Sequence, residues 1–211
     1  MQQGIVENNP VVGTALPGEE RQRERILVAD EIRVLWLATE GSGDYNAILR
    51  LLLLTGQRRE EIAGLHWSEL NLERTAWLIP VERTKNKRSH EVPLSQQAAQ
   101  IIRGLPRRHG RALVFGSGQG SFSGWSRAKA RLDDRSGLSG WILHDLRRTV
   151  VTGMNELGIP PHVVEAVVNH TSGHRAGVAG IYNRATYASE KRSGLQAWAD
   201  HIDEIVHGRS S

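Results

Sequence analysis

The stretch HDLRRTVVTGM, residues 144–154, places a histidine and an arginine three positions apart, where the apolar spacing predicts the start of a helix. A helix repeats every 3.6 residues, so His144 and Arg147 are expected to point at the same spot, which would be cationic or rich in hydrogen-bond donors. Taken alone, the pair is explained by a solvated helix start in which Asp145 complements the helix dipole. The question is which other side chains converge on it.

The composition indicates a globular protein of the cell interior. The chain has 211 residues, of which 39% are hydrophobic, enough for one substantial domain with a core. The longest apolar run, ILRLLLLTG, is interrupted by Arg50 and ends at Gly56, so no segment is expected to span a bilayer. The first residues, MQQGIVENNP, do not form a secretory signal, and the absence of cysteine removes disulfides and thiolate chemistry. We therefore expect a cytoplasmic protein.

Basic residues are concentrated in short stretches. The formal net charge is +4, and the sequence pI is about 9.8. The stretches RTKNKRSH (83–90) and RGLPRRHGR (103–111) contain several cations and no acid. Clustered cations favour a polyanionic partner, so nucleic acid is a candidate ligand.

The apolar pattern predicts a mainly helical fold. Two β-type runs, TAWLIPV (75–81) and HEVPLS (90–95), flank a basic loop and predict an antiparallel hairpin. The Gly/Ser-rich stretch 115–125 is expected to be a loop. The fold class is therefore α+β, mainly α-helical with a small antiparallel β-sheet. Apolar spacing and helix-ending residues predict helices over 25–40, 45–56, 58–67, 95–105, 144–159, 160–170 and 188–208.

The first twenty residues differ from the rest of the chain. Pro10, Gly13, Pro17 and Gly18 are typical of a linker. We therefore expect residues 1–20 to be the remnant of a linker that once followed other domains, and residues 21–211 to form one domain.

Four more residues are candidates for a functional site. Arg58, in TGQRREEI, starts a helix where free backbone N–H groups suit a phosphate. Glu61 could hold the Arg58 side chain in place, or form an exposed ion pair with it that adds little stability. Lys85 lies in the hairpin loop, His170 ends a helix before a loop, and Tyr182 follows in GIYNRATY. Each has an ordinary explanation by itself: a surface arginine, a solvated lysine, a helix-end histidine or a core tyrosine.

The order of the motifs carries more information than any one of them. TGQRREEI, TK in a basic hairpin, HDLRR, NH and YNR occur in sequence, with RILVADEI, GLHWSEL, AGVAGIYNR and AWADHI around them. In these motifs the chain resembles the catalytic domain of tyrosine recombinases, the phage integrase family. The resemblance extends from about residue 20 to the carboxy terminus, and the ending is most similar to integrases of prophages and genomic islands. It implies the fold of these DNA breaking-rejoining enzymes.

The resemblance implies a catalytic residue set with specific roles. It makes Arg58 and Arg147 the paired arginines, Lys85 the hairpin lysine, His144 and His170 the two histidines, and Tyr182 the nucleophile. Many relatives have LGH where this chain has VNH, a difference expected to change only helix packing. The interval from His170 to Tyr182 is longer than in shorter-looped relatives, which leaves Tyr187 as a rival nucleophile, although YNR favours Tyr182.

These residue types suit attack on a DNA phosphodiester. The reaction creates a five-coordinate phosphorus with extra negative charge, which two permanently protonated arginines can stabilise. The tyrosine must lose its proton, and His144 is the nearest candidate acceptor. Lys85 would protonate the leaving 5′-hydroxyl and His170 would donate a hydrogen bond to the phosphate. A 3′-phosphotyrosyl product retains the energy of the broken bond, so strand exchange needs no ATP.

The implied function is site-specific recombination that integrates or excises a prophage or genomic island. The implied partners are double-stranded DNA attachment sites, a homo-tetramer on DNA and accessory DNA-bending proteins, with the protein at the nucleoid. The isolated domain is expected to be a monomer. No cofactor or metal is expected, because the acids are mostly scattered or paired with bases. The final helix, from Ala188 onward, could pack within its own chain or on a neighbouring protomer. Its apolar positions include Leu195, Trp198, Ile202 and Ile205.

Three alternatives remain open from the sequence. A type IB topoisomerase would share the chemistry yet relax supercoils without choosing a partner. A DNA-binding regulator with a decayed catalytic set is a second alternative, although all six positions carry competent residue types. A metal site using His144, His170 and His174 is a third, but the spacing resembles no common ligand pattern.

Overall fold

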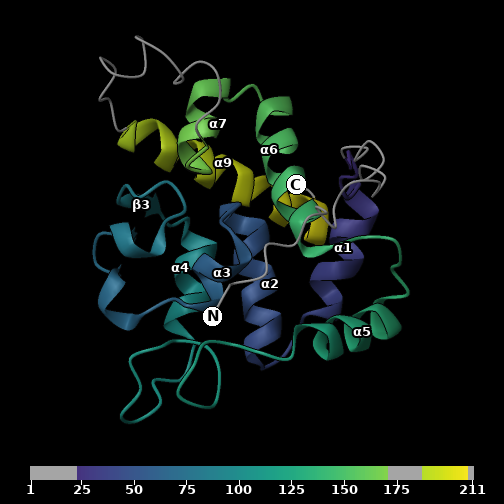
Figure 1. Cartoon of the computed structure of the whole chain (residues 1–211). Coiled ribbons are helices and arrows are strands. Elements are labelled where there is room, and N and C mark those ends of the chain that lie inside the picture. Colours follow the sequence, from purple (N-terminus) through teal and green to yellow (C-terminus); the bar gives the residue numbers. More distant parts are fainter. Residues whose placement is uncertain (1–22, 171–186, 209–211) are drawn as a thin grey trace, which may run out of the picture.

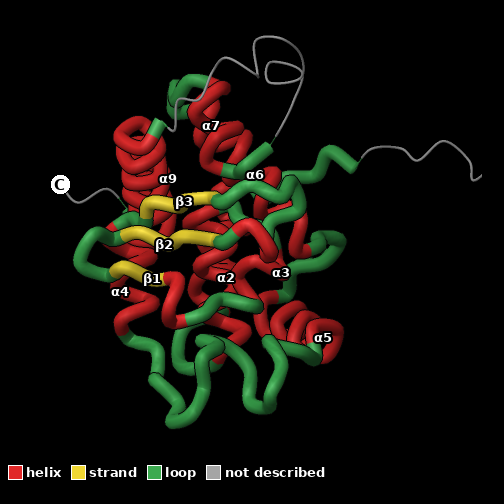
Figure 2. The backbone as a smooth tube through the Cα atoms, turned by 60° about the vertical axis from the view of Figure 1, so that its left-hand side comes forward, coloured by secondary structure: helices red, strands yellow, loops and turns green. Residues whose placement is uncertain are grey.

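The computed structural model describes residues 23–170 and 187–208 (Figure 1). Within these residues the fold is mainly helical, with a three-stranded antiparallel sheet on one side (Figure 2), which confirms the α+β class. No helix of the described parts is long and apolar enough to cross a membrane. The helices are α1 (Ala29–Ala38), α2 (Asp44–Thr55), α3 (Arg59–Ala63), α4 (Gln96–Arg103), α5 (Trp125–Ser136), α6 (Leu143–Glu156), α7 (Pro161–Val167) and α9 (Ala188–His207).

Helix α2 runs through the centre of the molecule (Figure 1). The leucines of its second half are buried on all sides, because α4, α6 and α9 pack around it. The helix ends at Gly56, whose φ of 64° is left-handed. A Cβ at this position would also lie 3.0 Å from the Val150 side chain and 3.2 Å from that of Val168. Glycine is therefore required both by the turn and by the close approach of α6 and α7.

The sheet has the order β1 (Leu70–Asn71), β2 (Ala76–Ile79) and β3 (His90–Pro93). Strands β2 and β3 are antiparallel, and Ile79 pairs with His90 next to the connecting loop, which confirms the predicted hairpin. Strand β1 was not predicted, since two residues are too few to show an alternating pattern. Residues 80–89, between β2 and β3, are called the hairpin loop below.

Helix α9 packs against its own chain, beside α1, α7 and β3. Leu195, Trp198 and Ile202 are buried, and Ile205 is half-buried. The Trp198 indole Nε1 donates to the Leu53 carbonyl at 2.7 Å. Of the two arrangements left open by the sequence, this structure has the one within the chain.

One predicted helix was much too long, and one helix was not predicted. The predicted helix over 58–67 ends at Ala63, and a short 3₁₀ helix at Trp67–Glu69 follows. Helix α5 was not predicted, because only Leu132 of its residues is fully buried and the segment shows no apolar stripe. It lies beside α1, next to the cleft described below.

Candidate active site

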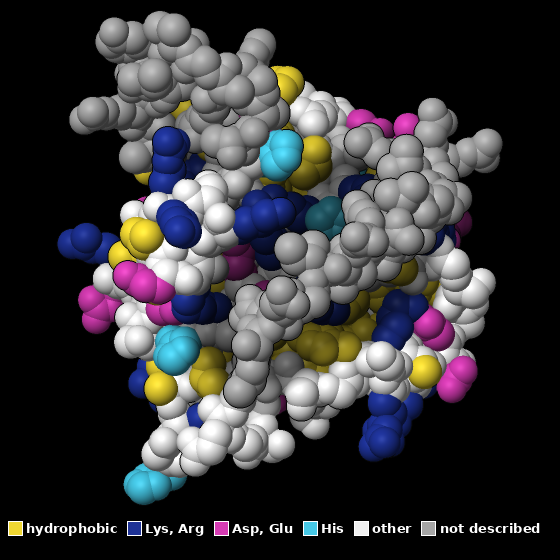
Figure 3. Space-filling model, viewed as in Figure 1, with side chains coloured by type: hydrophobic (Ala, Val, Ile, Leu, Met, Phe, Trp, Pro, Cys, Tyr) yellow, Lys and Arg dark blue, Asp and Glu magenta, His cyan; other side chains and the backbone are white. Residues whose placement is uncertain are grey.

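One cleft brings together four of the six side chains that the sequence motifs single out. It has a volume of about 850 Å³ and lies between the start of α3, the hairpin loop, α5 and the first turn of α6. The four that line it are Arg58, Lys85, His144 and Arg147. Figure 3 shows Lys and Arg side chains gathered near the middle of this face, beside histidine. His144 and Arg147 therefore face the same space, as their spacing in HDLRR predicted. Arg58 lies there too, as the family resemblance implied.

Arg147 is anchored to the ends of two other helices. Its Nη1 donates to the Gly56 carbonyl at 2.6 Å, after α2, and its Nη2 donates to the Val168 carbonyl, after α7. Burial lowers the pKa of Arg147 to about 10, and the neighbouring Arg58 cation adds to this effect while Glu61 opposes it. The guanidinium is still a cation at neutral pH, so a fixed positive charge faces the cleft.

Arg58 is held by a buried carboxylate. The Arg58 backbone N–H donates to Glu61 Oε2 at 2.8 Å, and its guanidinium Nη1 donates to Oε1 at 2.9 Å. The Glu61 side chain is only 3% exposed. Of the two roles considered from the sequence, Glu61 therefore has the holding one, because a buried acceptor fixes its partner far better than an exposed pair.

The carboxyl end of α7 joins three segments of the site. The Val167 carbonyl accepts a hydrogen bond from Gln57 Nε2 at 2.9 Å and lies 2.9 Å from His90 Nε2, while Arg147 binds the next carbonyl. Burial lowers the pKa of His90 to about 3, and the Lys191 cation adds to this, so the ring is neutral and Nε2 is the donor. These donors satisfy carbonyls that a helix end leaves unpaired. Gln57 and His90 were not predicted as site residues, although Gln57 lies within TGQRREEI and His90 within HEVPLS.

His144 is exposed at the first turn of α6. Its pKa is lowered by partial burial and by the cations Arg148 and Arg147, while Asp145 acts in the opposite direction. A histidine with a lowered pKa is neutral near pH 7 and can accept a proton. The solvated helix start considered from the sequence is wrong, because the Asp145 side chain is completely buried.

Lys85 lies on an exposed part of the hairpin loop. The loop is closed by buried Thr84, whose Oγ1 donates to the Arg88 carbonyl at 2.8 Å. The next residue, Asn86, pairs with Asn169: each Nδ2 donates to the other Oδ1, at 2.6 and 3.3 Å. Asn169 has a left-handed φ of 50°, which asparagine tolerates. The VNH motif was expected to change only helix packing, but its asparagine also tethers the hairpin loop.

The remaining candidates are not brought into the cleft within the described residues. His170 lies three residues beyond α7, exposed, and does not line the cleft. Tyr182 and His174 lie outside the described residues. Tyr187 precedes α9, with its ring centroid 5.0 Å from that of His162, and is likewise not among the cleft residues. No three His, Asp or Glu side chains converge as a metal site in 23–170 or 187–208.

A larger cleft, of about 1250 Å³, lies between the end of α1, α4 and the end of α9. Its lining includes Glu40, Asp200, Asp203 and Glu204 alongside Arg50. An acidic lining is unsuited to a DNA phosphate. We therefore assign the candidate active site to the smaller, cationic cleft.

Solved structures of integrases and recombinases have a similar fold. The integrase from mycobacterium phage Brujita matches with a TM-score of 0.68 at 20% identity, over 97% of this chain and 66% of that one. The Tn1549 transposon integrase, in complex with a circular intermediate DNA, matches with a TM-score of 0.62 at 15% identity, over 74% and 61%. The fold is that of a tyrosine recombinase catalytic domain.

Sequence comparison identifies the family. The profile of the Phage integrase family matches residues 20–188. Prophage integrase IntZ of Escherichia coli (strain K12) is 31% identical, over 98% of this chain and 52% of IntZ. The chain thus belongs to the phage integrase family, and it spans about half the length of this relative.

Proposed function

We propose that this chain carries out the cleavage and rejoining steps of site-specific DNA recombination, with residues 21–211 as the catalytic domain. The observation that carries the proposal is that Arg58 and Arg147, from segments 89 positions apart, line one cleft together with His144. The family match favours recombination over supercoil relaxation and over a decayed regulator.

The two arginines would stabilise the transition state. Attack on the phosphorus adds negative charge to the non-bridging oxygens, and a guanidinium fork matches two such oxygens. Both are held by protein partners before DNA arrives: Arg147 by two carbonyls and Arg58 by Glu61. Charges fixed in advance need no reorganisation during the reaction, which is the main advantage of such a site.

Protons move in and out of the cleft during the proposed reaction. The tyrosine oxygen forms a bond to phosphorus as His144, kept neutral by its lowered pKa, takes the phenol proton. The bond from phosphorus to the 5′-oxygen breaks, and Lys85 supplies the proton that this oxygen needs. His170 donates a hydrogen bond to the phosphate. The 3′-phosphotyrosyl bond is then attacked by a 5′-hydroxyl of another strand, in the reverse of the same steps.

We assign the nucleophile to Tyr182. The placement of Tyr187 supports this choice, because its ring packs against His162 at the start of α7 and does not line the cleft. The assignment to Tyr182 rests on the GIYNR motif alone, since this residue lies outside the described part of the chain.

The proposed substrates and partners follow from the family. The Tn1549 transposon integrase is in complex with DNA in its structure, which supports double-stranded DNA as the substrate of this chain. We further propose attachment sites of a prophage or genomic island, a homo-tetramer on DNA, accessory DNA-bending proteins and action at the nucleoid.

The test is capture of a covalent adduct. The chain is incubated with a library of nicked duplexes that have randomised cores, so that cleavage releases a short strand and traps the protein on DNA. We expect sequenced adducts to share a core, and the phosphotyrosyl peptide to contain Tyr182. Tyr182→Phe should abolish the adduct and Tyr187→Phe should retain it. An adduct that persists in Tyr182→Phe and disappears in Tyr187→Phe would overturn the nucleophile assignment, and no adduct at all would overturn the function.

A further inference from the structure

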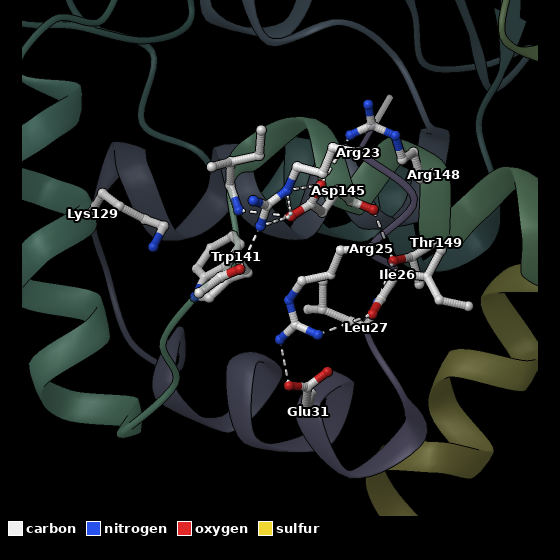
Figure 4. Close-up of polar contacts among 12 residues, drawn as sticks. Arg23, Arg25, Ile26, Leu27, Glu31, Lys129, Trp141, Asp145, Arg148 and Thr149 are labelled. Carbon is white, nitrogen blue, oxygen red and sulfur yellow. Dashed lines mark hydrogen bonds and ion pairs between the residues drawn. The ribbon is translucent and has the colours of Figure 1, made fainter. Parts of the chain in front are cut away.

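Asp145 is a fully buried carboxylate in the first turn of α6, the helix whose His144 and Arg147 line the candidate active site. Figure 4 shows its polar contacts. Its Oδ2 accepts from the Ile142 backbone N–H at 2.9 Å and from Arg23 Nη2 at 3.0 Å. Its Oδ1 accepts from Arg148 Nη1 at 2.9 Å, and Arg23 Nε lies 3.1 Å from both oxygens. Burying a charge is costly unless it is paired and hydrogen-bonded, and these donors offset the cost of burying the carboxylate.

Arg23 belongs to the segment that leads into the domain, 122 positions before Asp145. A second contact runs between the same two segments: the Leu27 backbone N–H donates to Thr149 Oγ1 at 2.9 Å. Thr149 Oγ1 in turn donates to the Asp145 backbone carbonyl at 2.8 Å. Residues 23–27 therefore lie along the first two turns of α6, as Figure 4 shows.

The position of Asp145 in the helix gives these contacts a consequence for the cleft. It directly follows His144 and lies two residues before Arg147, which both line the cleft. The bond to the Ile142 N–H also fixes where the helix begins. A shift of the first turn would move the proton acceptor and one arginine together, and a displacement of about 1 Å can cost about a hundredfold in rate.

We propose that Arg23 and Asp145 form a latch through which the segment entering the domain positions the first turn of α6 for catalysis. Asp145 is then a positioning residue of the reaction, and Arg23 is its partner. The proposal concerns the same site as the proposed DNA cleavage and rests on that function for its effect on rate. The latch also gives any domain attached before residue 23 a direct mechanical connection to His144 and Arg147.

The latch has an electrostatic consequence at His144. Asp145 favours the imidazolium form of His144, and Arg23 partly neutralises Asp145. Removing the Arg23 cation should therefore raise the pKa of His144, and removing the Asp145 carboxylate should lower it. The other charged groups around this ring come from α6, the start of α3, the hairpin loop and α5. They are Arg147, Arg148, Arg58, Arg59, Glu60, Glu61, Arg83, Lys85 and Lys129.

The first measurement is the titration of His144 in the 211-residue chain without DNA. Imidazole ¹H–¹⁵N spectra are recorded against pH, with the His144→Gln variant assigning the resonance. Arg23→Gln should raise the midpoint by about half a pH unit and Asp145→Asn should lower it by about as much. Arg25→Gln is the matched control, because Arg25 lies in the same segment but pairs with Glu31 at 2.6 Å. It should leave the midpoint unchanged.

The second measurement is the rate of adduct formation at saturating nicked DNA. Arg23→Gln should be about tenfold slower with little change in DNA affinity, since positioning affects the chemical step. Arg23→Lys keeps the charge but not the two-nitrogen contact with Asp145, so it should recover part of the rate. Arg25→Gln removes an equal charge from the same segment and should stay within about twofold.

Two results would overturn the latch. One is a His144 midpoint that is the same in the unaltered chain, Arg23→Gln and Asp145→Asn. The other is an equal loss of rate in Arg23→Gln and Arg25→Gln. If Asp145→Asn fails to fold, the Arg23→Gln titration decides alone. Because that titration needs no DNA, it tests the latch even if the unaltered chain forms no adduct, a result that would count against the proposed function only.

Discussion

The two arginines and the hairpin lysine line the same cleft but are held in different ways. Arg147 binds carbonyls at the ends of α2 and α7, and Arg58 binds buried Glu61. Lys85 lies on an exposed loop that is attached to α7 through the Asn86–Asn169 pair. We call Arg58, Arg147 and their partners the arginine floor, in contrast to the hairpin loop.

The difference follows from the chemistry proposed for each part. Charge stabilisation works best when the charges are fixed before the substrate arrives, so the floor is built from buried polar contacts. Proton delivery to a leaving oxygen requires reach, which a loop provides. Changes in the floor should therefore affect both stability and catalysis, whereas changes at the loop tip should affect catalysis alone.

The largest effect is expected for Arg147→Ala. Cleavage should fall about a thousandfold or more, because one of the two stabilising charges is lost. The free energy of unfolding should also fall by about 2–4 kcal/mol, because the Gly56 and Val168 carbonyls lose their donor. Single-turnover adduct formation and urea unfolding measure the two effects. Unchanged stability would show that the floor is not held as described.

Lys85→Ala should slow cleavage by about a hundredfold, the usual contribution of a general acid. Stability should change by less than about 0.5 kcal/mol, because the side chain is exposed. A substrate with sulfur in place of the bridging 5′-oxygen should restore the rate, since a thiolate leaves without a proton. Failure of that substrate to restore the rate would argue against proton donation by Lys85.

Glu61→Gln should slow cleavage by about tenfold, because Arg58 loses a charged partner and gains freedom to turn away from the phosphate. The matched control is Glu60→Gln, one position away. Glu60 is 66% exposed and pairs with Arg59, outside the floor. Equal rates for the two variants, measured in the same adduct assay, would mean that burial of the carboxylate has no role.

The smallest effect on catalysis, with a clear effect on stability, is expected from protonation of His90. Its pKa is about 3 in the folded chain against 6.5 ordinarily, so between these values only the unfolded chain binds the proton. The stabilisation is complete above pH 6.5 and is lost as the pH falls toward 3. Between pH 7 and pH 5, His90 alone should lower the free energy of unfolding by about 2 kcal/mol. In urea titrations, His90→Gln should weaken the pH dependence of the free energy of unfolding. An unchanged pH dependence in this variant would contradict the assignment to His90.

Much of the fold could be predicted from local patterns. The buried leucines of α2, the Gly56 ending and the apolar positions of α9 are visible in the sequence because a helix face repeats. Helix α5 was missed, since its residues bury little except Leu132, and β1 is only two residues long.

The site was predicted less completely, for a physical reason. Motif order could indicate which side chains converge, but not what holds them. Gln57 and His90 both bond the Val167 carbonyl, and Arg23 reaches Asp145 across 122 positions. Such pairings depend on the folded geometry. In a single sequence, the only sign of these pairings is a polar residue next to an apolar run.

The most direct test of the central claim is a structure of the Tyr182→Phe chain bound to a duplex recovered from the adduct library. We predict that the non-bridging oxygens of one phosphate lie within hydrogen-bond distance of both the Arg58 and the Arg147 guanidinium groups. A duplex bound elsewhere, with no phosphate in contact with this arginine pair, would contradict the account.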